Sequence, residues 1–62
     1  MKTLIDNLIN GNSTDAKRMA KRFTQTTIMK ELQEYAGHSL KKAYLGAIYL
    51  KTGKGWQEYC DA

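Results

Sequence analysis

Apolar residues recur along this chain at spacings of three and four, which is the period of a helix that buries one face. Glycine and polar residues separate the apolar stretches and proline is absent, so the pattern predicts short helices joined by turns. The first predicted helix covers residues 3 to 9, and Asn10-Gly11 supplies the left-handed residue that commonly ends a helix. Its apolar stripe consists of Leu4, Ile5, Leu8 and Ile9.

The second predicted helix, residues 15 to 23, divides most sharply into an apolar and a charged face. Asp15 complements the dipole of its first turn, and the preceding polar residues offer caps for its free N–H groups: Asn12, Ser13 and Thr14. Its apolar face consists of Ala16, Met19, Ala20 and Phe23. Its opposite face carries four cations, Lys17, Arg18, Lys21 and Arg22. Because these cations repel one another, the pattern favours a negatively charged partner.

Two longer helices and a terminal turn follow. Thr24 to Thr27 interrupt the apolar period and supply hydroxyl caps for a third helix, which Gly37 ends. The apolar positions of this third helix are Ile28, Met29, Leu32, Tyr35 and Ala36. A fourth helix begins at Ser39 and closes at Thr52-Gly53. One of its faces consists of Leu40, Ala43, Tyr44, Ala47 and Leu50, while Leu45 and Tyr49 point elsewhere. A last helical turn contains Trp56, Tyr59 and Cys60.

These elements predict an all-α fold, a compact bundle of four short helices plus a short C-terminal helix. A chain of 62 residues supports a single domain, residues 1–62, and buries only about 60% of the surface that it exposes when unfolded. We expect the core to consist of Leu4, Leu8, Met19, Phe23, Ile28, Leu32, Tyr44, Ala47, Leu50 and Trp56.

Composition argues against a membrane protein and for a cytoplasmic one. The longest nearly apolar stretch, Ala43 to Leu50, falls far short of the roughly 20 residues that cross a bilayer. Asp6 and Asn7 interrupt the apolar start before a signal-peptide core develops. The single Cys60 excludes an internal disulfide, and a lone thiol is typical of cytosolic proteins.

The charge of the chain is unevenly distributed. Its formal net charge is +4, and residues 15 to 30 carry five cations against the single acid Asp15. One interpretation is that Lys17, Arg18, Lys21 and Arg22 bind phosphates or the acidic surface of a protein. The other is that they are the solvated outer face of an ordinary amphipathic helix.

A second group of cations is Lys41, Lys42, Lys51 and Lys54. They extend the positive surface if the fold brings the fourth helix beside the second, and are otherwise solvated lysines. Residues 28 to 52 also admit a helix-turn-helix with residues 37 to 39 as its turn, which directs Lys41 and Lys42 at a DNA groove. The apolar composition of the fourth helix opposes this alternative, because a recognition helix leaves polar side chains free for base edges.

No residue pattern indicates catalysis, a metal or a cofactor. His38 and Cys60 are a candidate base and nucleophile, but nothing in the sequence brings them together, and the plainer interpretation is a turn histidine and a small apolar thiol. One histidine and one cysteine cannot supply the four ligands of a structural zinc site. Residues 51 to 55 lack the first glycine of a phosphate-binding loop and the hydroxyl after its lysine. We expect neither an enzyme nor a cofactor.

Two stretches of the chain carry a resemblance to known proteins. One runs from Leu8 to Arg18 and continues through Ala20-Lys21-Arg22-Phe23; the other is Tyr49 to Gly53 followed by Gly55-Trp56-Gln57 and Tyr59 to Ala62. Both are similar to short helical accessory proteins encoded by bacteriophages and plasmids. This resemblance implies a bacterial host cell and a protein that binds host machinery, including defence systems that hold nucleic acid.

The sequence therefore predicts a small non-catalytic binding protein whose basic helix face engages, and by occupancy blocks, a host protein or a protein–nucleic acid complex. Two alternatives stay open. One is a direct DNA- or RNA-binding protein of helix-turn-helix type. The other is a self-associating structural module that uses exposed Leu45 and Tyr49 of the fourth helix.

Overall fold

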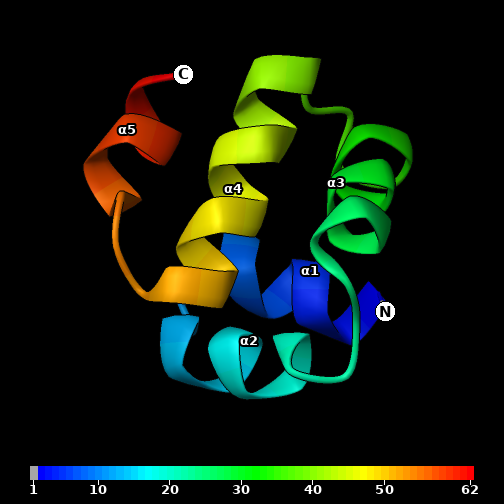
Figure 1. The fold of residues 1–62 in the computed structure, drawn as a ribbon, viewed down its shortest axis with the longest axis vertical. Coiled ribbons are helices and arrows are strands. Elements are labelled where there is room, and N and C mark those ends of the chain that lie inside the picture. The colour runs from blue at the N-terminus through cyan, green and yellow to red at the C-terminus, as the bar shows by residue number, and fades with distance from the viewer. Residues whose placement is uncertain (1) are drawn as a thin grey trace.

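The computed structural model describes residues 2–62, which form helices joined by short turns, with no strand among them (Figure 1). The elements in chain order are α1 (Lys2–Ile9), α2 (Ser13–Ala20), α3 (Gln25–Glu34), α4 (Leu40–Thr52) and α5 (Trp56–Asp61). The predicted all-α fold of four short helices and a shorter C-terminal one is confirmed. Within the described residues, no helix has the length and apolar character needed to span a membrane.

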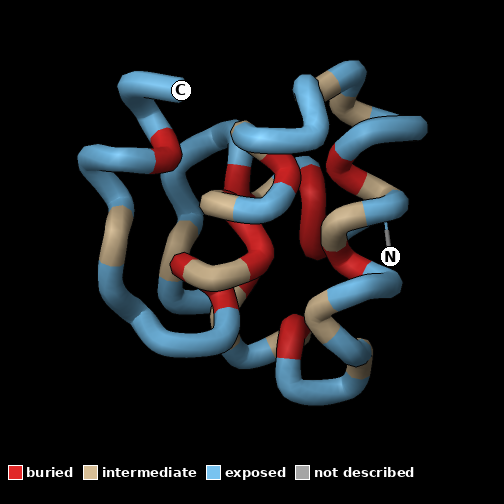
Figure 2. The backbone as a smooth tube through the Cα atoms, turned by 45° about the horizontal axis from the view of Figure 1, so that its top comes forward, coloured by how far each residue is buried: buried red, intermediate tan, exposed pale blue. Residues whose placement is uncertain are grey.

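Helix α4 is the central element. It stands between α3 and α5, and α2 crosses beneath its C-terminal end while packing against α1 (Figure 1). The buried parts of the backbone face one another inside this arrangement, and the turns lie at the surface (Figure 2). The buried core consists of Leu4, Ile5, Leu8, Ala16, Ala20, Ile28, Leu32, Ala43, Ala47, Tyr49, Leu50 and Tyr59.

The predicted core is wrong at two aromatic residues. Tyr44 and Trp56 are 48% and 39% exposed, whereas Tyr49, expected to point elsewhere, is 7% exposed. Helix α4 is apolar nearly all round, so the helical period alone does not decide which tyrosine turns inward. Contacts with α5 decide it, because the Tyr49 ring packs 5.0 Å from the Trp56 ring, centroid to centroid.

Other core predictions need smaller corrections. Met19 and Phe23 are only partly buried, although both pack against the core. Leu40 lies on the outward face of α4, and Leu45 is half-buried against the core. The exposed Leu45 and Tyr49 surface expected for self-association is therefore absent from this fold.

Helix α2 is displaced from the predicted range of residues 15 to 23, since it begins two residues earlier, at Ser13, and ends three residues earlier. It ends at Ala20, and the next three residues form tight turns in which each N–H donates to the carbonyl three residues earlier, at 3.4, 3.2 and 3.1 Å. The Nζ of Lys51 in α4 donates to the carbonyl oxygen of Ala20 at 2.8 Å and also to that of Phe23. Lys51 thereby satisfies carbonyl groups that the end of α2 leaves without helical partners.

Hydroxyl caps begin the two longest helices, as the sequence predicts. Thr24 Oγ1 accepts from the Thr27 N–H at 3.2 Å at the start of α3, and Ser39 Oγ accepts from the Lys42 N–H at 3.2 Å at the start of α4. Asn12 precedes α2 but makes no such side-chain bond. The turn before α3 is therefore fixed at both ends, by Lys51 and by Thr24.

Gly46 is the point where α3, α4 and α5 meet. A methyl group at this position would lie 2.9 Å from Leu32 Cδ1 and 2.9 Å from Tyr59 Cε1. Both neighbours are buried, so neither moves away without disturbing the core. The absence of a side chain at Gly46 is what allows α3 and α5 to approach α4 closely.

We expect Gly46→Ala to lower the free energy of unfolding by about 1 kcal/mol, although alanine has the higher helix propensity. Overpacking costs about 1 to 3 kcal/mol, which outweighs the gain of about 1 kcal/mol in propensity. Gly46→Val adds bulk and loses more. Urea unfolding measures both, with Lys41→Ala on the outward face of α4 as the control. A Gly46→Ala protein more stable than wild type contradicts this packing.

Replacing Lys51 tests the bonds at the end of α2. Lys51→Met keeps most of the aliphatic chain and removes the donor, and we expect a loss of roughly 1 kcal/mol in the free energy of unfolding. Lys54→Met is the matched control, because Lys54 is exposed and its hydrogen bonds among the described residues, both with Thr52 Oγ1, use backbone atoms only. Equal stability of the two variants in thermal unfolding would show that the Lys51 bonds contribute nothing.

His38 connects the turn before α4 to α5. Its Nε2 and the Tyr59 hydroxyl share a hydrogen bond of 2.7 Å, and the Nζ of Lys42 lies 5.2 Å from the centre of the Tyr59 ring. Partial burial lowers the pKa of His38 below its usual 6.5, and the nearby Lys42 charge lowers it further. Burial raises the pKa of the Tyr59 hydroxyl, and the electrostatic effect of Cys60 raises it further. The hydroxyl is therefore protonated at neutral pH.

This arrangement predicts that the protein loses stability in mild acid. Below pH 6.5 the unfolded chain binds a proton at His38 more readily than the folded one, so the free energy of unfolding falls until the folded-state pKa is passed. Above pH 6.5 the contribution of His38 to the free energy of unfolding is constant. His38 is the only histidine, so His38→Gln should flatten the melting temperature between pH 5 and pH 7. Parallel pH profiles for the two proteins would refute the assignment.

Candidate functional site

The four cations predicted to bind a partner lie on α2 and the turn after it, and we call them the basic surface: Lys17, Arg18, Lys21 and Arg22. The structure divides them between two backbone settings. Lys17 and Arg18 belong to the last turns of α2, whereas Lys21 and Arg22 belong to the tight turn that leads to α3. The basic surface therefore continues toward α3 and does not end on one helix.

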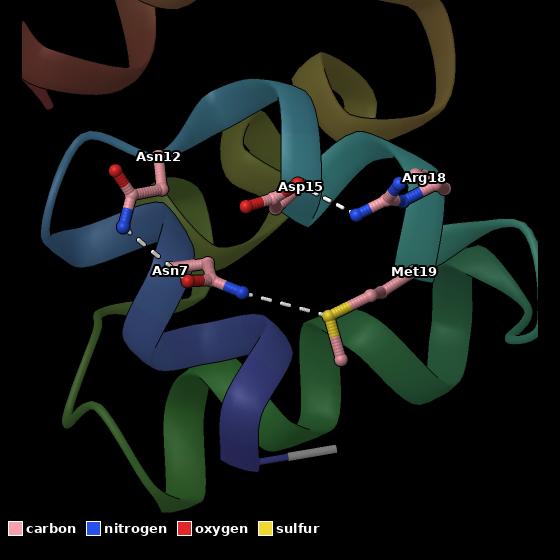
Figure 3. Close-up of polar contacts among 5 residues, drawn as sticks. All are labelled: Asn7, Asn12, Asp15, Arg18 and Met19. Carbon is pink, nitrogen blue, oxygen red and sulfur yellow. Dashed lines mark hydrogen bonds and ion pairs between the residues drawn. The ribbon is translucent and has the colours of Figure 1, made fainter.

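Lys17 and Arg18 both have partners within the fold. The Nζ of Lys17 lies 5.2 Å from the centre of the Tyr49 ring, a cation–π contact that joins α2 to α4. Arg18 Nη2 pairs with Asp15 Oδ1 at 2.7 Å on the outer side of α2 (Figure 3). Their side chains are 74% and 52% exposed, so water screens this pair and it contributes little stability.

The opposite side of α2 faces the protein. Met19, the residue after Arg18, points toward α1, where the Asn7 amide nitrogen lies 3.5 Å from its sulfur (Figure 3). Ala16 and Ala20 complete the buried side. The packing of α2 therefore directs its cations outward.

Lys21 and Arg22 are exposed, and their side chains make no hydrogen bond or ion pair with any described residue. Their backbone is held by the tight turns and by the Lys51 bonds to the flanking carbonyls. Lys21 and Arg22 are therefore two cations on a fixed turn whose side chains are free to pair with an anionic partner.

A cavity of about 490 Å³ opens between α2 and the C-terminal end of α4. It is lined by Thr14, Lys17, Arg18, Lys21, Leu50, Lys51, Thr52 and Gly53. Three members of the basic surface therefore border it, and Arg22 lies outside it. The concentration of positive charge around one opening favours an anionic group there.

The second predicted group of lysines is dispersed by the fold. Lys51 alone reaches the basic surface, and its ammonium group is occupied by the end of α2. Lys42 lies over the Tyr59 ring. Lys41 borders a separate cavity of about 330 Å³ between α4 and α5, together with Glu58 and Asp61. The proposed continuous extension of the positive surface is therefore limited to Lys51.

The segment that carries the basic surface exposes no large apolar side chain. The large apolar side chains that are exposed among the described residues are Ile9, Tyr35, Leu40, Tyr44 and Trp56. None of them lies between residues 10 and 34, the stretch that contains α2, the turn and α3. This distribution was not predictable from the sequence, because Tyr44 and Trp56 have the spacing of core residues.

The remaining reactive groups do not assemble into a site. His38 bonds to Tyr59, and the Cys60 thiol is exposed and free. Within residues 2–62, no three histidine, cysteine or acidic side chains gather in a way that would hold a metal ion.

Comparison of the chain with protein-family models, with curated proteins and with solved structures finds no match. The resemblance to phage and plasmid accessory proteins stays a prediction.

Proposed function

We propose that this protein is a non-catalytic binding protein that contacts the phosphate backbone of nucleic acid through the basic surface. The single observation that carries the proposal is the setting of Lys21 and Arg22, two unpaired exposed cations on a fixed turn, in a stretch free of exposed large apolar side chains. Lys17 and Arg18 widen the positive area along α2. Phosphate contacts need this combination of charge and position, and no apolar anchor.

The second candidate function is that this protein binds and blocks a host protein or a protein–nucleic acid complex. An acidic protein surface also attracts Lys17, Arg18, Lys21 and Arg22. Tight protein interfaces, however, take most of their energy from buried aromatic and other large side chains. Those side chains are exposed on α4 and α5, at Tyr44 and Trp56; Trp56 approaches the basic surface only at Lys17, through the Tyr49 ring that both contact. Because the segment that carries Lys21 and Arg22 exposes no large apolar side chain of its own, we favour nucleic acid over a protein partner.

We expect the wild-type chain to bind a short DNA duplex at low salt, with affinity falling linearly in the logarithm of salt concentration. Neutralising both free cations in Lys21→Gln/Arg22→Gln should weaken binding and reduce the slope by about 1.8, because each lost phosphate contact removes about 0.9. Fluorescence anisotropy over a salt series measures both quantities.

The matched control is Lys41→Gln/Lys54→Gln, which removes the same charge from other exposed positions. Its slope should stay close to that of wild type. Equal losses in the two double variants would mean that net charge alone drives binding. An absence of binding to nucleic acid at low salt would overturn the proposal and leave the acidic protein partner, which a nuclease-treated lysate pull-down would then identify.

A further inference from the structure

Helix α3 has a polar outward face. Thr26, Lys30 and Gln33 are exposed and lie at spacings of four and three, so they share one side of the helix. Ile28 and Leu32 on the other side are fully buried. None of the side chains of the outward stripe has a hydrogen-bonding partner among the described residues, so all three are free to contact a ligand.

The turn before α3 joins this polar face to the basic surface. Helix α2 lies across the lower end of the molecule and α3 rises beside α4, so the chain changes direction within residues 21 to 24 (Figure 1). The Lys51 bonds fix the start of this turn, and the Thr24 cap fixes its end. Two helices joined at a steep angle by a turn of this length have the connection of a helix-turn-helix, although α2 packs mainly on α1 and α4, and α3 on α4, rather than on each other.

The pair α3 and α4, which the sequence admits as an alternative helix-turn-helix, fits less well. The outward face of α4 presents Leu40 and Tyr44, and Lys42 is occupied by the Tyr59 ring. Lys41 is also exposed, but it borders the cavity that Glu58 and Asp61 line, and the other sides of α4 pack against α3, α5 and α2. A recognition helix needs an accessible face with donors and acceptors for base edges, and α3 has one where α4 has not.

The dimensions of α3 suit the major groove of duplex DNA. Its ten residues give a length of about 15 Å, and a helix with side chains is about 10 to 12 Å across, close to the groove width of about 12 Å. Lysine suits the acceptors of guanine, glutamine those of adenine, and the threonine methyl group that of thymine. Glu34, the exposed acid on this side of α3, lies at the end furthest from the cations of the turn.

We propose that α2, the turn and α3 form a helix-turn-helix that places α3 in the major groove of duplex DNA. Lys21 and Arg22 then contact the phosphates beside the groove, and Thr26, Lys30 and Gln33 face base edges. This inference rests on the proposed function, because the same cations supply the affinity. It adds a substrate class, duplex DNA, and residues that read its sequence.

The test begins with selection of duplexes by the full-length chain from a random library, followed by affinity measurement on the selected duplex and on a scrambled one. Lys30→Ala and Gln33→Ala should each weaken binding to the selected duplex by roughly 5- to 150-fold, which is the range for one lost base contact. Neither should change binding to the scrambled duplex. Lys21→Gln/Arg22→Gln should weaken both equally.

Tyr44→Ala on the outward face of α4 is the control and should leave both affinities unchanged, with circular dichroism confirming that every variant is folded. Binding to duplex DNA without an enriched sequence, or with α3 variants that behave as wild type, would overturn the inference and leave the proposed function intact. Tighter binding to single-stranded DNA or RNA than to any duplex would do the same. No binding to any nucleic acid would overturn both.

Discussion

The close packing of three helices at Gly46 is the constraint on which the rest of the structure depends. Because this position has no side chain, Leu32 of α3 and Tyr59 of α5 both reach the backbone of α4. Helix α3 must therefore turn the side that contains Ile28 and Leu32 inward, which leaves its polar side facing solvent. The surface proposed to meet DNA is the direct consequence of how the core is filled.

The Lys51 ammonium group connects this core to the basic surface. It leaves α4 and donates to the carbonyls at the end of α2, where the helix stops and the turn begins. Lys17 makes a second connection through the Tyr49 ring. Lys51 and Lys17 thus join α2 to α4, whereas Lys21 and Arg22 are exposed and have no partner among the described residues. In this small chain, basic residues therefore have two roles: some hold α2 against α4, and others are proposed to bind the partner.

The helical elements were predictable because apolar spacing and polar caps are local properties, and Thr24 and Ser39 cap helices as expected. The features that depend on contacts between helices were not predictable. The period of α4 does not distinguish Tyr44 from Tyr49, and contact with Trp56 settles which one is buried. The early end of α2 depends on Lys51, thirty-one residues from Ala20. The cations of the basic surface were visible in the sequence, but the position of Thr26, Lys30 and Gln33 relative to that surface followed only from the fold.

The most direct measurement is a two-dimensional NMR titration of the isotopically labelled protein with duplex DNA. The account predicts that the backbone amide signals that shift belong to residues 17 to 33, centred on the turn and the outward face of α3, while those around Leu40 and Tyr44 stay in place. Shifts concentrated on the outward face of α4, with α3 unchanged, would contradict it.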